Sequence, residues 1–222
     1  MSSVVKKEII LLGQPTELAA GLHCHETIIS ALACHRKMLD TALAQCVNRS
    51  EALTEAAVRL IETLRSGHKV LVAGNGGSAA EAQHFAAELV GRFKRERSPY
   101  AVLSLTTDTS ILTAVANDYG YHDVFARQIL AYGQPGDLLL AFSTSGESEN
   151  LVCAATAAQR CRMAMIAITG DRQSRLESLA NVTVRVPTVD TAITQELHMM
   201  VTHILCDIVE SELMGCEGDT DK

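Results

Sequence analysis

The sequence predicts an α/β fold, with a doubly wound, five-stranded parallel sheet and long N-terminal helices. Five short apolar segments alternate with helical segments, which is typical of parallel strands joined by right-handed crossovers. Two of these segments end in turns rich in glycine or serine, at the edge where such sheets bind ligands. The expected strands cover about residues 69–73, 101–104, 137–142, 163–169 and 181–186.

The expected helices follow from apolar periodicity and from breaks at glycine. They cover about residues 16–48, 50–65, 78–92, 107–131, 148–161, 174–180 and 191–214. The first two carry more apolar surface than a three-layer domain needs, so we expect them to pack against copies of the chain. The predicted organisation is an N-terminal extension over 1–15, one domain with its oligomerisation helices over 16–214, and a polar tail over 215–222.

Composition limits the classes of function. The chain has 222 residues, 47% of them apolar, and a net charge of −7, which argues against an extended nucleic-acid surface. A basic group after one helix (Lys94, Arg95 and Arg97) is expected to be a solvated turn. No apolar run approaches the roughly 18 residues of a membrane helix, and no signal peptide is evident. Seven cysteines without a Cys-x-x-Cys pair are expected to be small buried residues in a reducing cytoplasm.

The turn after the first strand predicts an anion site. Glycines at 74, 76 and 77 let the backbone approach an anion closely, and Ser78 is expected to cap the helix that follows. The turn lacks the Lys-Ser/Thr pair of a nucleotide-binding loop, and Ala79 occupies the place of the third glycine of a dinucleotide motif. Taken alone, it could equally be a tight connection without a ligand.

A second turn of the same kind follows the third strand. It carries three hydroxyl side chains, Ser143, Thr144 and Ser145, and then Gly146 and Ser148 as a helix begins. Hydroxyl groups and backbone N–H groups at a helix N-terminus suit a phosphate monoester that must be both bound and released. Two such turns on one sheet edge favour a phosphate ligand over two unrelated caps.

Histidines and a carboxylate form a candidate metal site. His84 and Glu88 are four residues apart and therefore share a helix face. On the last helix, His203 lies roughly 80° from Gln195 and His198 roughly 60° in the opposite direction, so the two histidines point differently. Such side chains suit zinc or a similar divalent ion. The alternative is that the histidines of this apolar helix are core residues.

Five motifs carry a resemblance to a known family: Gly74-Asn-Gly-Gly-Ser78, His84-Phe-Ala-Ala-Glu88, Ala116-Asn-Asp118, Ser143-Thr-Ser-Gly-Glu-Ser148 and Gln195-Glu-x-His-x-x-x-x-His203. In order and spacing they resemble the sugar-isomerase (SIS) domain, a flavodoxin-like fold, from about residue 50 to 212. More narrowly, the chain resembles the sedoheptulose 7-phosphate isomerases, also called phosphoheptose isomerases. One departure is Glu147, where the family often has asparagine.

The resemblance implies a homotetramer that binds a sugar phosphate and one zinc per subunit. Composition predicts a cytoplasmic protein with no nucleic acid or membrane as partner. The implied zinc ligands are His84, Glu88, Gln195 and His203. The expected substrate-binding residues are Asn75, Gly76, Gly77, Ser78, Glu88, Asn117, Asp118, Ser143, Thr144, Ser145, Ser148 and Gln195.

The implied reaction converts the ketose D-sedoheptulose 7-phosphate to D-glycero-D-manno-heptose 7-phosphate through an enediol. Moving a carbonyl between neighbouring carbons needs a base and an acid, for which Glu88 and His203 are the candidates. The alternatives are an isomerase of another long sugar phosphate, an aminosugar enzyme of the wider family, and a non-catalytic regulator of the branch that associates with the replication initiator. That last branch lacks the acid and the histidine at these two positions, so their presence favours the enzyme.

Overall fold

The computed structural model describes the backbone of residues 17–217 and the side chains of residues 23–214. The chain divides into two compact units, and the boundary between them follows Thr41. The predicted extension over 1–15 and the last part of the predicted tail, 218–222, lie outside the described residues. The predicted single domain over 16–214 stays a prediction.

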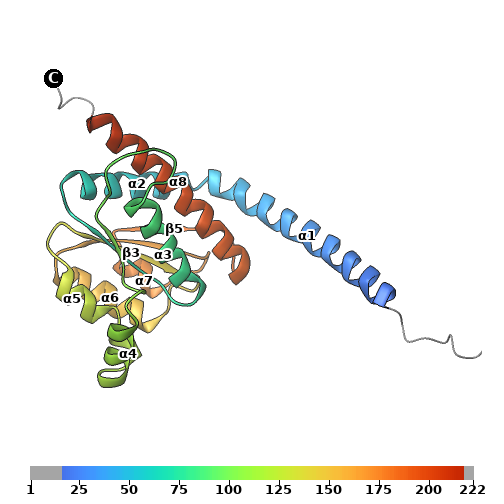
Figure 1. Ribbon diagram of the computed structural model, residues 1–222, viewed down its shortest axis with the longest axis horizontal. Coiled ribbons are helices and arrows are strands. Elements are labelled where there is room, and N and C mark those ends of the chain that lie inside the picture. Colours follow the sequence, from blue (N-terminus) through green and yellow to red (C-terminus); the bar gives the residue numbers. More distant parts are fainter. Residues whose placement is uncertain (1–16, 218–222) are drawn as a thin grey trace, which may run out of the picture. The chain divides into compact units, whose positions relative to one another are not determined.

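The described residues form an α/β fold with a five-stranded, all-parallel sheet in the order β2-β1-β3-β4-β5, which confirms the predicted fold class (Figure 1). The order reverses direction between β1 and β3, so the two predicted turns follow neighbouring strands. The strands are β1 (Val70–Ala73), β2 (Val102–Ser104), β3 (Leu138–Ser143), β4 (Ala164–Thr169) and β5 (Val182–Arg185).

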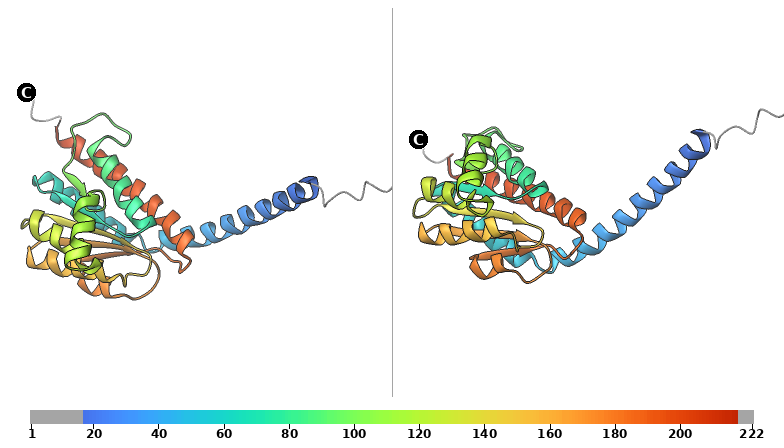
Figure 2. Two further views of the ribbon diagram at one scale, coloured as in Figure 1. Left: turned by 60° about the horizontal axis from the view of Figure 1, so that its bottom comes forward. Right: turned by 90° about the horizontal axis from the view of Figure 1, so that it is seen from below.

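Helices cover both faces of this sheet, as Figures 1 and 2 show. The helices α2, α3 and α8 pack together over one face, and α5, α6 and α7 pack over the other. The described helices are α1 (Glu17–Val47), α2 (Ser50–Arg65), α3 (Gly77–Val90), α4 (Thr109–Asp118), the 3₁₀ turn η1 (Tyr121–Asp123), α5 (Ala126–Tyr132), α6 (Glu149–Arg160), α7 (Arg175–Leu179) and α8 (Thr191–Glu217).

The core lies between the sheet and its helices. Every residue of β3 is buried, as expected for a central strand covered on both faces. Alternate side chains point to opposite faces, so Leu139 and Ala141 join the core cluster beneath α5 and α6. Phe142 faces the other side, where its ring lies 6.5 Å from that of Phe85 on α3. Each fully buried leucine or phenylalanine contributes about 1.5–3 kcal/mol to folding, so this packing stabilises the strands from which the two turns extend.

Two sequence expectations about the fold were wrong. The single helix expected over 107–131 is interrupted, because Gly120 has a φ of +101° that a helix cannot contain. The cysteines are not uniformly buried. Cys206 is buried, but Cys24 and Cys34 are exposed on α1.

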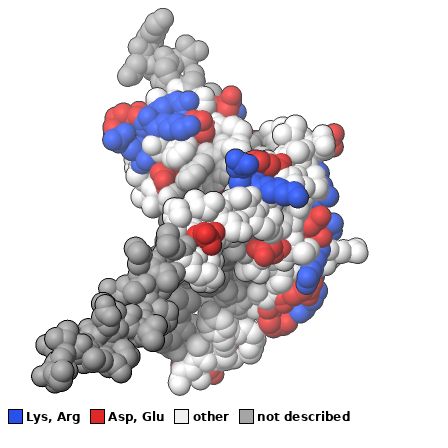
Figure 3. Space-filling view, turned by 90° about the vertical axis from the view of Figure 1, so that its right-hand side faces the viewer, with Lys and Arg blue, Asp and Glu red and all other residues white. Residues whose placement is uncertain are grey.

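Charged residues of opposite sign adjoin one another on the face shown in Figure 3, and among the described residues there they form no continuous basic surface. None of the described helices is long and apolar enough to cross a membrane.

Candidate active site

The turn after β1 brings a helix N-terminus to the sheet edge. Gly76, with φ +56° and ψ −121°, precedes the first residue of α3. Ser78 does not cap the helix as expected, because α3 begins one residue earlier, at Gly77; its side chain is instead buried. Gly74 is required by close packing, since a Cβ there would lie 2.3 Å from the Ser78 carbonyl oxygen. The turn is therefore tighter than the sequence indicates.

Two asparagines join this turn to α6. The Asn75 amide Nδ2 donates to Asn150 Oδ1 at 2.9 Å, and the Asn150 amide donates back to Asn75 Oδ1 at 2.8 Å. The Tyr121 hydroxyl also donates to Asn75 Oδ1, at 3.1 Å. Sequence reasoning missed both Asn150 and Tyr121, although the position of Asn150, two residues after Ser148, is a signal that could have suggested it. These hydrogen bonds between Asn75 and Asn150 fix the distance between the two turns.

The turn after β3 is ordered by its own hydroxyl groups. The Ser143 Oγ accepts the Gly146 N–H at 3.0 Å, and the Ser145 Oγ accepts the Glu147 N–H at 3.2 Å. The Glu147 carboxylate accepts the backbone N–H of Arg175 at 2.9 Å. The acidic group that departs from the family pattern is thus bonded to the start of α7.

The two turns meet at one small cavity of about 110 Å³. A water molecule occupies about 30 Å³ in the liquid, so the cavity has room for a group as small as a phosphate. Its lining residues are Asn75, Ser78, Phe142, Ser143, Thr144, Ser148 and Gln195. The structure does not bring every predicted binding residue to it. Ser145 is exposed outside the lining, and so are Asn117 and Asp118 at the end of α4.

Gln195 comes from the second turn of α8 and reaches this cavity beside the N-terminus of α3. It lies so close to Gly77 that a Cβ there would be 2.2 Å from its Nε2 atom. Glycine at position 77 therefore gives the amide room beside the helix N-terminus. This contact brings α8 into the same site as the two strand turns.

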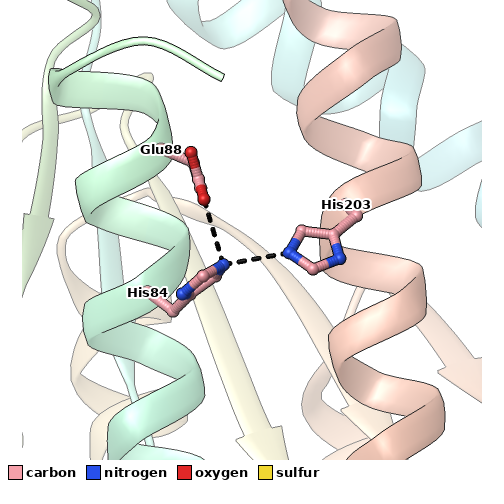
Figure 4. Close-up of side chains that lie close together, drawn as sticks. All are labelled: His84, Glu88 and His203. Carbon is pink, nitrogen blue, oxygen red and sulfur yellow. Dashed lines mark hydrogen bonds and ion pairs between the residues drawn. The ribbon is translucent and has the colours of Figure 1, made fainter. Parts of the chain in front are cut away.

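Further along the same two helices, His84, Glu88 and His203 converge (Figure 4). The Nε2 of His84 lies 3.1 Å from Glu88 Oε1 and 3.0 Å from His203 Nε2. Two ligand atoms of a tetrahedral zinc ion, each about 2.1 Å from it, are about 3.4 Å apart. The observed spacings are close to that value, and the side chains of His84 and Glu88 are 40% and 22% exposed. The three groups thus fit a divalent ion open to a substrate.

The other histidine of α8 belongs to the core, as its predicted direction indicates. His198 is fully buried, and its Nδ1 lies 3.3 Å from the carboxylate of Glu81 on α3. Cys206 is buried nearby, and burial together with the charge of Glu88 raises the pKa of its thiol to about 12. That thiol remains protonated at neutral pH and is a poor metal ligand.

Comparison with known proteins agrees with this geometry. The SIS domain family matches residues 35–170. The chain is 48% identical over 174 residues to a phosphoheptose isomerase of Shewanella sediminis, covering 75% of this chain and 88% of that one. The chain belongs to the phosphoheptose isomerase family. A phosphoheptose isomerase of Thiobacillus denitrificans is 50% identical over 168 residues, covering 74% of this chain and 85% of that one.

A solved structure extends the family likeness to three dimensions. A phosphoheptose isomerase from Francisella tularensis superposes with a TM-score of 0.79 at 36% sequence identity, covering 82% of this chain and 98% of that one. As a member of the phosphoheptose isomerase family, the chain is a sugar-phosphate isomerase.

Proposed function

We propose that this protein converts D-sedoheptulose 7-phosphate to D-glycero-D-manno-heptose 7-phosphate. The observation that carries the proposal is the convergence of His84, Glu88 and His203 on the two helices that also border the cavity. A phosphate-sized polar cavity and an acid–base cluster on the same helices suit a substrate with a phosphate at one end and a carbonyl at the other.

The cavity would bind the phosphate. The N–H groups at the start of α3 and the hydroxyl groups of Ser143, Thr144 and Ser148 offer hydrogen bonds without a fixed cation. Ser148 is free for this role, because its side chain makes no cap hydrogen bond to α6. Binding energy gained at the phosphate then helps to orient the reacting end of the sugar. Asn117, Asp118 and Ser145, which the resemblance implies as further contacts, remain proposals.

Glu88 would take the proton from the carbon beside the carbonyl, and His203 would supply and remove the proton on oxygen, giving an enediol between the two steps. Each side chain has two polar atoms. Glu88 turns Oε1 toward His84, and His203 turns Nε2 toward His84. The second carboxylate oxygen and the second ring nitrogen remain for proton transfer. The same residues can therefore bind an ion and move protons.

We propose that one zinc ion per subunit is held by His84, Glu88 and His203, with Gln195 as the fourth ligand. When bound, zinc would polarise the carbonyl and the neighbouring hydroxyl group of the sugar. The spacing of the three described ligand atoms supports this assignment. The amide of Gln195 lies beside Gly77 in the lining of the cavity, so its role as fourth ligand rests on the family resemblance alone.

We also propose that the protein is a cytoplasmic homotetramer. The helix α1 exposes Ile28, Ile29 and Leu32 at 56%, 54% and 63% of their surface, and such residues on one helix suit contact with further copies of the chain. Light scattering on the purified protein measures the number of subunits. A monomer at micromolar concentration would contradict this assignment.

The metal assignment is tested by zinc analysis of His84→Ala and His203→Ala beside wild type. Wild type should hold about one zinc per subunit, and each variant much less, because both ligands are needed for a stable site. His68→Ala is a matched control, since His68 precedes β1 at the opposite edge of the sheet. Equal zinc content in all four proteins would refute the site.

The reaction is tested with Glu88→Gln, which keeps shape and an oxygen atom but removes the base. Its kcat should fall by at least about 10², the usual effect of losing a positioned base. In D₂O, wild type should incorporate deuterium beside the carbonyl of sedoheptulose 7-phosphate, and the variant should not. If zinc-loaded wild type neither isomerises this sugar nor exchanges that proton, the proposed substrate is wrong.

A further inference from the structure

The loop after α3 is bound to α8 by one buried carboxylate. Glu210 is fully buried and accepts the backbone N–H groups of Phe93, Lys94 and Arg95 at 3.0, 2.9 and 3.0 Å. Its Oε1 also lies 3.2 Å from Nε of Arg97, whose side chain is fully buried. The expectation of a solvated turn was therefore wrong for Arg97, because its partner on α8 is more than a hundred residues away in the sequence.

A second carboxylate on α8 binds the same loop. Asp207 lies 2.9 Å from Nζ of Lys94 and 2.7 Å from Nη1 of Arg95. His203, Asp207 and Glu210 are spaced four and three residues apart, which puts them on one face of α8. Burial raises the pKa of Glu210, but the three backbone N–H groups and Arg97 lower it by more than burial raises it. The net pKa lies below that of an ordinary glutamate, so Glu210 is ionised at neutral pH. The loop is thus fixed to the helix face that carries His203.

The loop places an aromatic ring against His203. The rings of Phe93 and His203 are stacked, with centroids 5.5 Å apart and planes inclined by 11°. The His84 ring meets His203 from another direction, with centroids 5.1 Å apart and planes at 69°. The torsion that turns an imidazole about its Cβ–Cγ bond has a broad energy profile, so nothing intrinsic to histidine fixes the ring plane.

We propose that Phe93, fixed by the loop that Glu210 anchors, is a positioning residue that holds the imidazole of His203 with Nε2 toward His84 and Glu88. Rotation of the ring would replace this nitrogen with carbon or turn it away from the site. A stacked aromatic pair favours one arrangement by about 2- to 12-fold. The effect on catalysis rests on the proposed function of His203, whereas the orientation of its ring does not.

The test compares Phe93→Leu with Phe93→Tyr, which keeps the stacked ring, and with Tyr132→Leu as an aromatic-to-leucine control on α5. Histidine carbon-13 resonances of the metal-free protein report the ring, with His203→Asn identifying the His203 signal. We expect that signal to shift and broaden in Phe93→Leu and to stay near its wild-type position in the other two variants. Glu210→Gln should move it in the same direction as Phe93→Leu.

Kinetics give a second readout. In Phe93→Leu, kcat for sedoheptulose 7-phosphate should fall about 2- to 12-fold with little change in KM, and Phe93→Tyr should restore it. An unchanged His203 signal in Phe93→Leu, or equal losses of kcat in Phe93→Leu and Phe93→Tyr, would overturn the positioning role. Absence of isomerase activity in wild type would overturn the proposed function alone, because the resonance comparison needs no activity.

Discussion

Replacing Gly77 with alanine separates the role of Gln195 from the stability of the fold. The new Cβ would lie 2.2 Å from Nε2 of Gln195, which is 1.2 Å short of the 3.4 Å where ordinary contact begins. The atoms in the way are the amide end of a flexible side chain and not backbone. We therefore expect the amide to move and the helix to stay in place.

The two effects differ in size. Alanine is favoured over glycine inside a helix by about 1 kcal/mol, and a displaced side chain costs about 0.5–1.5 kcal/mol. The free energy of unfolding of Gly77→Ala should thus remain within about 1 kcal/mol of wild type. A catalytic-site group misplaced by about 1 Å can lower the rate by about 10², so kcat/KM should fall by about 10- to 100-fold.

Gly76→Ala is the control for the effect of a new Cβ on stability. Its φ of +56° is unfavourable for alanine, but the added Cβ would meet open space. It should lose about 1–3 kcal/mol of stability without touching Gln195. Urea unfolding followed by circular dichroism, together with initial rates on sedoheptulose 7-phosphate, measures both quantities. If Gly77→Ala keeps kcat/KM within threefold of wild type, the proposed role of Gln195 as a zinc ligand is wrong.

Two further predictions concern the cavity and the opposite edge of the sheet. Ser143→Ala should raise KM about tenfold or more with a smaller change in kcat, because a hydrogen bond to a charged group is worth about 1.5–3 kcal/mol and is made throughout the reaction; loss of kcat at constant KM would contradict phosphate binding. Burial raises the pKa of Asp137, but hydrogen bonds from Lys69 and Gln134 lower it by more, so the pKa in the folded protein lies below that of an ordinary aspartate. The ionised Asp137 therefore stabilises the fold at pH values above the ordinary aspartate pKa, and this stabilisation is lost as the pH falls through the lower folded pKa. The free energy of unfolding of wild type, measured in urea, should therefore decline below about pH 4, and Asp137→Asn should make this decline shallower. If the variant shows the same decline as wild type, Asp137 is not the group responsible.

The sequence predicted what depends on local pattern. Each expected strand lies within a residue or two of the observed one, because apolar runs ended by glycine or serine leave little choice of boundary. The pairing of His84 with Glu88 follows from the helical repeat alone, and so does the divergence of His198 from His203. These features need no knowledge of tertiary contacts.

The features that were missed depend on contacts between distant segments. Phe93 is an ordinary loop residue until Glu210, on another helix, fixes the loop beside His203. The break at Gly120 was missed because apolar periodicity continues on both sides of it. Likewise, the sequence indicates only that Asn75 lies in a turn, and the structure shows that its side chain is hydrogen-bonded to Asn150.

The helix α3 carries both ends of the proposed site, and this has a consequence for the choice of sugar. Ser78 borders the phosphate cavity and His84 belongs to the reacting cluster, six residues later, which is about 9 Å along the axis of a rigid helix. On the proposed assignment, the helix fixes the distance between the phosphate of the substrate and its reacting carbons. A sugar phosphate one or two carbons shorter, anchored in the same cavity, would leave its carbonyl short of Glu88, so discrimination by chain length follows from a fixed distance and needs no contact with the sugar's middle carbons.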